Sequence, residues 1–214
     1  MPELVEVTAG DPPELWSSLG FTVQSGRCRI GTVDIVLDPD VGKGIRRWSF
    51  AGGAATPAAI EGLPTEWVDG PGEATTLPHD NGVVGIDHIV VLSPDVDRTV
   101  EALAEVGFEP RRERLTDTYG SPMRQVFFRA GDAILELIGG QTATGEGKIR
   151  VFGLALTSGD LDATVAHFGE RLHRPKDAVQ PGRRIATLDR SAGSTVALAF
   201  MSSAPVTTKH GGDA

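Results

Sequence analysis

At 214 residues the chain can bury a substantial hydrophobic core, either as one large domain or as a small domain beside a complete one. Asp and Glu outnumber Lys and Arg by 29 to 20, a formal net charge of −9, so the sequence offers no basic face for nucleic acid or an acidic membrane. Cys28 is the only cysteine, which excludes an intrachain disulfide and a cysteine-rich metal site.

The first residues, MPELVEVTAGDPPELW, carry acidic side chains where a signal peptide needs a basic segment followed by an apolar one. No apolar run in the chain approaches the length needed to span a membrane. Together with the single cysteine, these features predict a cytoplasmic protein with no membrane partner.

Residues 1–50 follow the order strand, helix and strands, in the runs LVEVT, PPELWSSLGF, TVQS, RCRIG and TVDIVLD. We interpret them as a truncated βαβββ-like module. A strand-like GIRRWSF begins at Gly44 and could open a fourth, truncated module. Residues 51–84 are rich in Gly, Pro, Ala and Thr without a sustained period, which predicts a linker against which Leu63 and Trp67 could still pack.

Residues 85–140 and 149–203 repeat one plan. Each begins with an apolar strand-like run, IDHIVVLS or IRVFGLALTS, and continues into an amphipathic helix that starts at an Asp. Alternating or apolar strand-like runs follow, separated by turn residues, so the order is strand, helix, strand, strand, strand. Aligning Val96 with Leu161 gives an offset of 65 residues between the two modules. Residues 204–214 are polar and are expected to form a flexible tail.

The segment IDHIVVLSPDVDRTVEALAEVGF, followed by VFFRAGDAILELI, resembles the glyoxalase-like, or vicinal oxygen chelate, superfamily, which includes glyoxalases, bleomycin-resistance proteins, extradiol dioxygenases and methylmalonyl-CoA epimerases. The resemblance covers residues 85–203 well and residues 1–50 more loosely. It implies an α+β fold of paired βαβββ modules, whose curled mixed sheets enclose a cleft. In this superfamily each module normally gives one metal ligand from its first strand and one from its last.

Carried over to this sequence, the resemblance implies His88 and Glu136 as metal ligands, and Glu136 also as a general base at a carbon next to a carbonyl. The second module breaks the pattern. With the 65-residue offset His88 maps onto Gly153, and Glu136 maps onto Ala197 or Leu198, none of which can bind a metal.

Three ways of completing the site stay open. A second subunit of a homodimer could add its own His88 and Glu136. The N-terminal module could supply a carboxylate from Glu3, Glu6 or Asp34. Alternatively, the divalent metal has been lost, no other cofactor replaces it, and the cleft binds a small molecule by shape and hydrogen bonds.

The hairpin LTDTYGSPMRQVFFR is expected to form a wall of the cleft, with Tyr119, Arg124, Gln125 and Phe127 as ligand contacts. Strand alternation sends Gln125 and Phe127 to one face and Arg124 to the other, and the sequence leaves open which set faces inward. The predicted function is action on a small oxygenated metabolite, as an isomerase or lyase with Glu136 as base. The alternative is a non-catalytic binding protein of the sequestration or resistance type that has lost the metal site.

Overall fold

The computed structural model describes residues 1–70, 77–117, 120–143 and 145–203. Within these ranges the strands join into one mixed 14-stranded sheet, and three α-helices pack beside it. Short 3-10 helices occur at Pro39–Val41, Gly169–Arg171 and Arg190–Ala192. The expected α+β class with curled sheets is confirmed.

The first C-terminal module has the order β7, α2, β8, β9 and β10. Its bounds are β7 Val83–Leu92, α2 Val96–Glu105, β8 Pro110–Thr116, β9 Met123–Ala130 and β10 Ala133–Gly140. The last strand, β10, pairs parallel with the first strand, β7, and antiparallel with β9, which in turn pairs with β8. A βαβββ unit therefore forms one arm of the sheet.

The second C-terminal module repeats this connectivity. It contains β11 Arg150–Ser158, α3 Leu161–Phe168, β12 Lys176–Asp177, β13 Arg184–Thr187 and β14 Ala197–Ser202. Strand β14 pairs parallel with β11, and β13 adds antiparallel to β14. Strands β7 and β11 pair antiparallel, so they join the two modules along a shared central seam.

The two modules share local details at the predicted offset. Asp95 caps α2 and Asp160 caps α3, each through a side-chain oxygen that accepts backbone N–H groups of the first turn. A buried hydroxyl pair ties each first strand to its helix, Ser93 with Thr99 at 2.8 Å and Ser158 with Thr164 at 2.7 Å. Each of these three positions repeats after 65 residues, which supports the alignment made from the sequence.

The N-terminal half contains β1 Glu3–Ala9, α1 Pro13–Ser18, β2 Arg27–Ile30 and β3 Val33–Leu37, followed by β4 Ile45–Ala51, β5 Ala59–Ile60 and β6 Leu63–Val68. Strand β1 pairs parallel with β3, β4 pairs parallel with β6, and β1 and β4 pair antiparallel. This is the same arrangement of two modules in reduced form, and the second of them lacks the helix.

Part of the stretch expected to be a linker, residues 51–84, is therefore strand. The indole of Trp48 donates a hydrogen bond to the Thr65 hydroxyl at 2.7 Å, and Trp67 packs against Phe50 with ring centroids 5.6 Å apart. Leu63 is buried in the core. These contacts hold β6 against β4 although the surrounding sequence has the composition of a loop.

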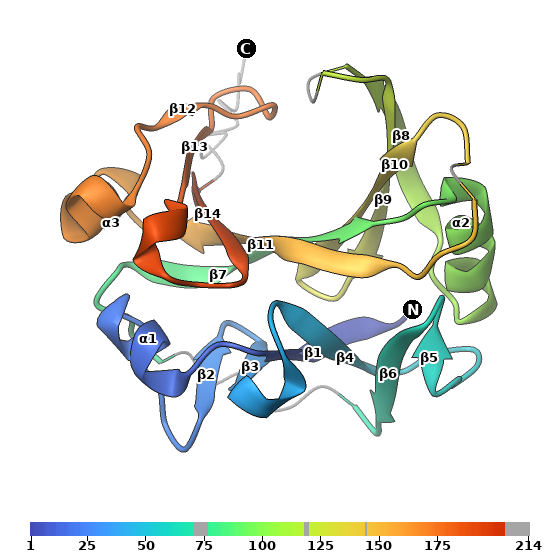
Figure 1. The fold of residues 1–214 in the computed structure, drawn as a ribbon, viewed down its shortest axis with the longest axis horizontal. Helices are drawn as coiled ribbons and strands as arrows, with labels where there is room; N and C mark the ends of the chain where they lie inside the picture. The colour runs from blue at the N-terminus through green and yellow to red at the C-terminus, as the bar shows by residue number, and fades with distance from the viewer. Residues whose placement is uncertain (71–76, 118–119, 144, 204–214) are drawn as a thin grey trace, which may run out of the picture.

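Figure 1 shows that the C-terminal strands curl into a U, with β8, β9 and β10 in one arm and β12, β13 and β14 in the other. Helices α2 and α3 lie outside the U, and the N-terminal half lies beneath it. A chain of aromatic contacts from Phe50 through Phe108 to Phe128 crosses the boundary between the halves. The hydrophobic core thus lies between the outer face of the U, its helices and the N-terminal sheet.

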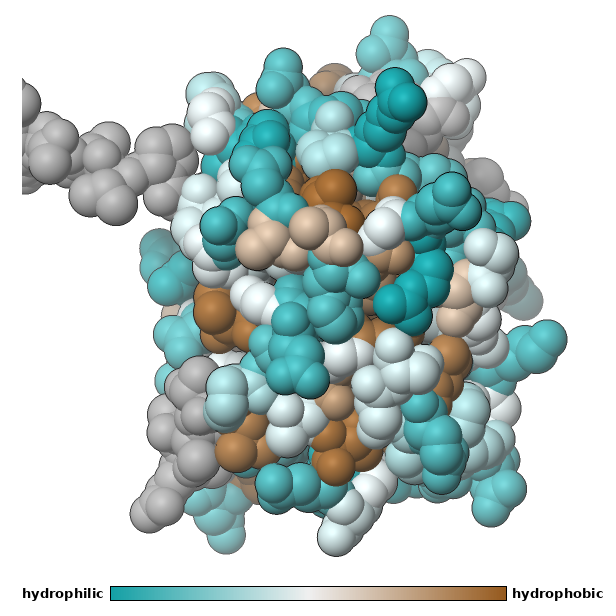
Figure 2. All heavy atoms as spheres, turned by 90° about the vertical axis from the view of Figure 1, so that its left-hand side faces the viewer, coloured by the Kyte–Doolittle hydropathy of each residue, from teal (hydrophilic) through white to brown (hydrophobic). Residues whose placement is uncertain are grey.

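One end of the molecule, where α1 and α3 lie, is mostly hydrophilic, and hydrophobic side chains reach its surface in separate groups (Figure 2). Among the helices of the described residues, none combines the length and apolar character that a membrane crossing requires.

Candidate functional site

The two residues singled out in the first module lie on one face of the sheet. Strand β10 pairs with β7 so that Ile134 lies beside His88 and Glu136 beside Val90. The neighbours Leu135 and Ile89 are fully buried in the core, so alternation directs His88 and Glu136 to the inner face of the U. Glu136 Oε2 lies 3.3 Å from His88 Nε2, and the two side chains are only 11% and 15% exposed.

A β-bulge adds a third residue to this pair. In the pairing of β7 with β11, Ala155 lies opposite His88 and Leu156 opposite Ile86, so Asp87 has no partner of its own. The extra residue breaks the alternation and turns the Asp87 side chain toward its neighbour. Asp87 Oδ1 consequently lies 2.8 Å from His88 Nδ1.

Arg183, which immediately precedes β13 in the second module, holds the other oxygen of Asp87. Its guanidinium lies 2.6 Å from Asp87 Oδ2 and also donates to the carbonyl of Ser202 at 2.8 Å. Burial alone would raise the pKa of Asp87, but hydrogen bonds from His88 and Arg183 outweigh it and hold the pKa below its ordinary value. Asp87 is thus an ionised acceptor, and the ring nitrogen facing it carries a proton.

Gln125 and Arg114 continue the chain of contacts on the other side of Glu136. The Gln125 amide donates to Glu136 Oε1 at 2.6 Å, and its carbonyl oxygen accepts from Arg114 Nε at 2.8 Å. Burial raises the pKa of Glu136, and the electrostatic influence of His88 and Arg114 opposes that rise only in part. A buried carboxyl with a raised pKa, beside an imidazole, forms an arrangement able to exchange a proton.

The predicted ligand contacts divide between the two faces. Phe127 lies directly opposite Glu136 and Gln125 opposite Ile138, so both face inward. Arg124 instead lies on the outer face, where it pairs with Glu113 at 2.7 Å and with Asp97 of α2. The structure therefore does not bring Arg124 to the other site residues, because a two-residue turn at positions 131 and 132 fixes the register. Tyr119 lies outside the described residues.

Sequence reasoning missed three members of the network, namely Asp87, Arg114 and Arg183. Asp87 adjoins His88, but only the bulge places the two side chains on one face. Arg183 belongs to a basic doublet that resembles a solvent-exposed turn, and its role depends on a contact between modules. Arg114 could have been found by extending the hairpin register from Gln125, its partner on β9.

The second-module positions that would complete a metal site carry no side chain able to bind a metal. Strand pairing relates His88 to Gly153, as expected, and relates Glu136 to Ala199, because Ala155 corresponds to Val90. The equivalent of Glu136 is therefore Ala199, and the expectation of Ala197 or Leu198 was wrong by one or two residues.

Gly153 cannot be exchanged for a ligand without moving the backbone. A Cβ atom at this position would lie 2.1 Å from the carbonyl oxygen of Ala197 in β14. Because the obstacle is the main chain of a paired strand, it cannot swing aside as a side chain could. The close packing of β11 against β14 therefore excludes a metal-binding side chain at position 153.

The carboxylates of the N-terminal half do not fill the gap. Glu6 pairs with Arg27 at 2.6 Å, and Asp34 pairs with Arg29 at 2.7 Å, both on the N-terminal sheet. Within the described ranges, no group of three or more His, Cys, Asp or Glu side chains is disposed to hold a metal ion. The described residues of a single chain therefore do not by themselves complete a divalent-metal site.

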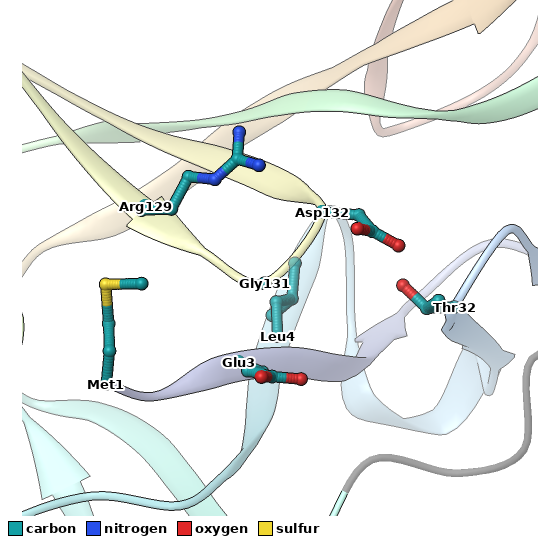
Figure 3. A pocket seen from close by; sticks show the side chains of 7 residues that line it. All are labelled: Met1, Glu3, Leu4, Thr32, Arg129, Gly131 and Asp132. Carbon is teal, nitrogen blue, oxygen red and sulfur yellow. The ribbon is translucent and has the colours of Figure 1, made fainter.

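Two cavities lie away from this network. One, of about 230 Å³, lies where β1 meets the β9–β10 turn and is lined by Met1, Glu3, Leu4, Thr32, Arg129, Gly131 and Asp132 (Figure 3). The other, of about 350 Å³, lies between α2 and the segment that leads into β5. Glu3, considered above as a metal ligand, thus lines a cavity at the boundary between the halves.

Comparison with solved structures finds a similar fold along nearly the whole chain. A mutant of 4-hydroxymandelate synthase from Streptomyces coelicolor aligns with a TM-score of 0.61 at 14% identity, covering 94% of this chain and 92% of the synthase. Methylmalonyl-CoA epimerase from Mycobacterium tuberculosis aligns over 58% of this chain and 91% of its own length, with a TM-score of 0.48 and 20% identity. No family model matches the sequence, and no curated protein matches it.

Proposed function

We propose, for a chain that has the glyoxalase-like fold, that the inner face of the C-terminal sheet binds a small oxygenated metabolite and that Glu136 moves a proton on it. The observation that carries the proposal is the contact between Glu136 and His88, at 3.3 Å, with the far side of the imidazole held by Asp87. A base, a proton acceptor and an orienting carboxylate are thereby aligned.

The raised pKa of Glu136 suits removal of a proton from a carbon next to a carbonyl. A carboxylate with an elevated pKa is a stronger base once it is ionised, and burial keeps competing water away. His88 Nε2 is close enough to exchange a proton with Glu136 between steps. Return of a proton to the opposite face of the same carbon gives an isomerase, and loss of a leaving group from the enolate gives a lyase.

The alternative function, non-catalytic binding, is favoured by one specific observation. Both oxygens of Glu136 are already engaged, one by Gln125 at 2.6 Å and the other by His88. A carboxylate held on both sides could serve only to stabilise the inner face. On that account the protein would sequester its ligand without changing it.

Proton exchange in heavy water separates the two functions. A panel of small oxo acids, hydroxy acids and thioesters is incubated with the protein in D₂O, and loss of the proton next to the carbonyl is followed by NMR. We expect exchange with at least one compound, reduced at least 100-fold in Glu136→Gln and unchanged in Glu113→Gln. Glu113 is a suitable control because it faces outward and pairs with Arg124. Binding of a compound without exchange would favour the sequestering function.

A divalent metal at His88 and Glu136 would need ligands from beyond this network. A second copy of the chain, the homodimer considered from the sequence, is the source that would double both donors. This arrangement remains a prediction, and the metal content of the protein tests it.

A further inference from the structure

The inner face of the C-terminal sheet carries an unexpected excess of positive charge. The chain as a whole has a formal charge of −9. On strands β7 to β11, however, pairing places four arginines on the inner face, Arg112, Arg114, Arg129 and Arg150, against the two carboxylates Asp87 and Glu136. An acidic protein thus concentrates arginines on the face that holds its candidate site.

Two of these arginines lie in the same cross-strand rows as the site residues. Glu136 lies opposite Phe127, which in turn lies opposite Arg112. His88 lies beside Ile134, which lies opposite Arg129. Side chains directly across from one another share a face, so both rows end in a guanidinium on the same arm of the U.

Internal ion pairs do not occupy the guanidinium groups on the inner face of this arm. Among the described residues, no carboxylate pairs with Arg112, Arg114 or Arg129. Figure 3 shows the side chain of Arg129 rising from β9 away from Glu3, although both line the boundary cavity. Arg112 and Arg129 are also exposed to solvent, so a ligand can reach them.

The second module places small residues opposite this arm. Four of its inner-face positions on β11 and β14 are occupied by Gly153, Ala155, Ala197 and Ala199. The metal ligands that the resemblance leads one to expect are absent from these positions, and Gly153 cannot regain one. The positive charge on this face therefore comes from arginines, of which Arg112, Arg114 and Arg129 belong to the first module and Arg150 to the second.

We infer that the ligand of this face is a small carboxylate, held by Arg112 and Arg129 with its oxygenated carbon near Glu136 and His88. Guanidinium groups bind carboxylates through paired, charge-assisted hydrogen bonds, and they need no metal to do so. The inference rests on the proposed function for the position of the reacting carbon, but the binding itself is independent of catalysis.

Calorimetric titration of the full chain with malonate and pyruvate tests this inference, with malonamide and inorganic phosphate as comparison ligands. At low ionic strength we expect at least one carboxylate to bind, more weakly as salt is added, and malonamide not to bind. The double variant Arg112→Gln with Arg129→Gln should weaken carboxylate binding at least tenfold. Arg184→Gln, which alters an exposed ion pair with Asp162 beside α3, should leave it unchanged.

Equal affinity for malonate and malonamide would overturn the inference. Unaltered carboxylate affinity in the double variant would also overturn it. The same holds if no carboxylate binds, or if phosphate alone binds. If the double variant is unfolded by circular dichroism, each single variant is titrated instead, with a threefold loss expected from each. Carboxylate binding without proton exchange would leave the inference standing and contradict only the proposed function.

Discussion

Glu136 Oε2 and His88 Nε2 lie 3.3 Å apart on the inner face of the first C-terminal module, although their Cα atoms belong to neighbouring parallel strands and to different rows of the sheet. Gln125 holds the other oxygen of Glu136, and Asp87 holds the other nitrogen of His88. The pair is therefore fixed from both sides by residues of its own chain.

The variant Glu136→Gln is expected to be more stable than the wild type at high pH. The pKa of Glu136 is raised above its ordinary value of 4.5, so the folded state holds this proton more tightly than the unfolded state does. The associated stability is present below pH 4.5 and is lost as pH rises through the folded pKa. We expect the free energy of unfolding of Glu136→Gln to exceed that of the wild type by about 1 kcal/mol at pH 8. The difference should vanish near pH 4, as measured by urea unfolding at both pH values.

Removal of the Arg183 guanidinium should destabilise the fold strongly. Arg183 and Asp87 are only 11% and 12% exposed, and a buried carboxylate that loses its arginine partner is costly. We expect Arg183→Met to lower the free energy of unfolding by about 3 kcal/mol. The adjacent Arg184, whose pair with Asp162 is exposed, provides the control, and Arg184→Met should leave the denaturation midpoint unchanged. Equal midpoints for the two variants would contradict the buried network.

A methyl group at Gly153 should be poorly tolerated. Its Cβ would lie 2.1 Å from the Ala197 carbonyl oxygen, so Gly153→Ala should cost about 3 kcal/mol or more, or force β14 away from β11. At Gly85, on the neighbouring strand of the same seam, an added methyl carbon would meet no atom within 4 Å. Thermal unfolding should therefore place Gly85→Ala close to the wild type, and similar losses in both variants would refute the packing argument.

His79 is expected to make the connection between the halves sensitive to acid. Its Nδ1 accepts the backbone N–H of Thr22 at 3.1 Å, and its Nε2 lies 3.0 Å from the carbonyl of Arg29. Burial lowers the pKa of His79 below 6.5, so the folded state disfavours the proton. Stability should fall as pH drops through 6.5 toward the folded pKa. His79→Gln should flatten that dependence between pH 5 and 7, measured by urea unfolding across the range.

The modular fold could be predicted because its signals are local. Helix caps at Asp95 and Asp160 and the periodic apolar residues after them recur at one offset, and the structure uses both caps. Strands β5 and β6 could not be predicted in the same way. They depend on long-range contacts, such as the hydrogen bond from Trp48 to Thr65, in a stretch with the composition of a loop.

For the candidate site, the sequence indicated His88 and Glu136 but not the face on which the hairpin residues lie. The turn after Ala130 contained that information, because a two-residue turn sets Ala133 opposite Ala130 and therefore Glu136 opposite Phe127. Neither the bulge at Asp87 nor the contact of Arg183 with Asp87 could be predicted from the sequence. Both depend on how the two modules meet along β7 and β11.

The metal content of the purified protein tests the central claim most directly, namely that His88 and Glu136 form a proton-exchanging pair rather than half of a metal site. The wild type and His88→Ala are dialysed against magnesium, manganese, zinc and ferrous salts in turn, then analysed for bound metal and for mass in solution. We predict well under one ion per chain in both proteins, with no difference between them. One tightly bound ion per chain, or one per dimer, that is lost in His88→Ala would contradict the account.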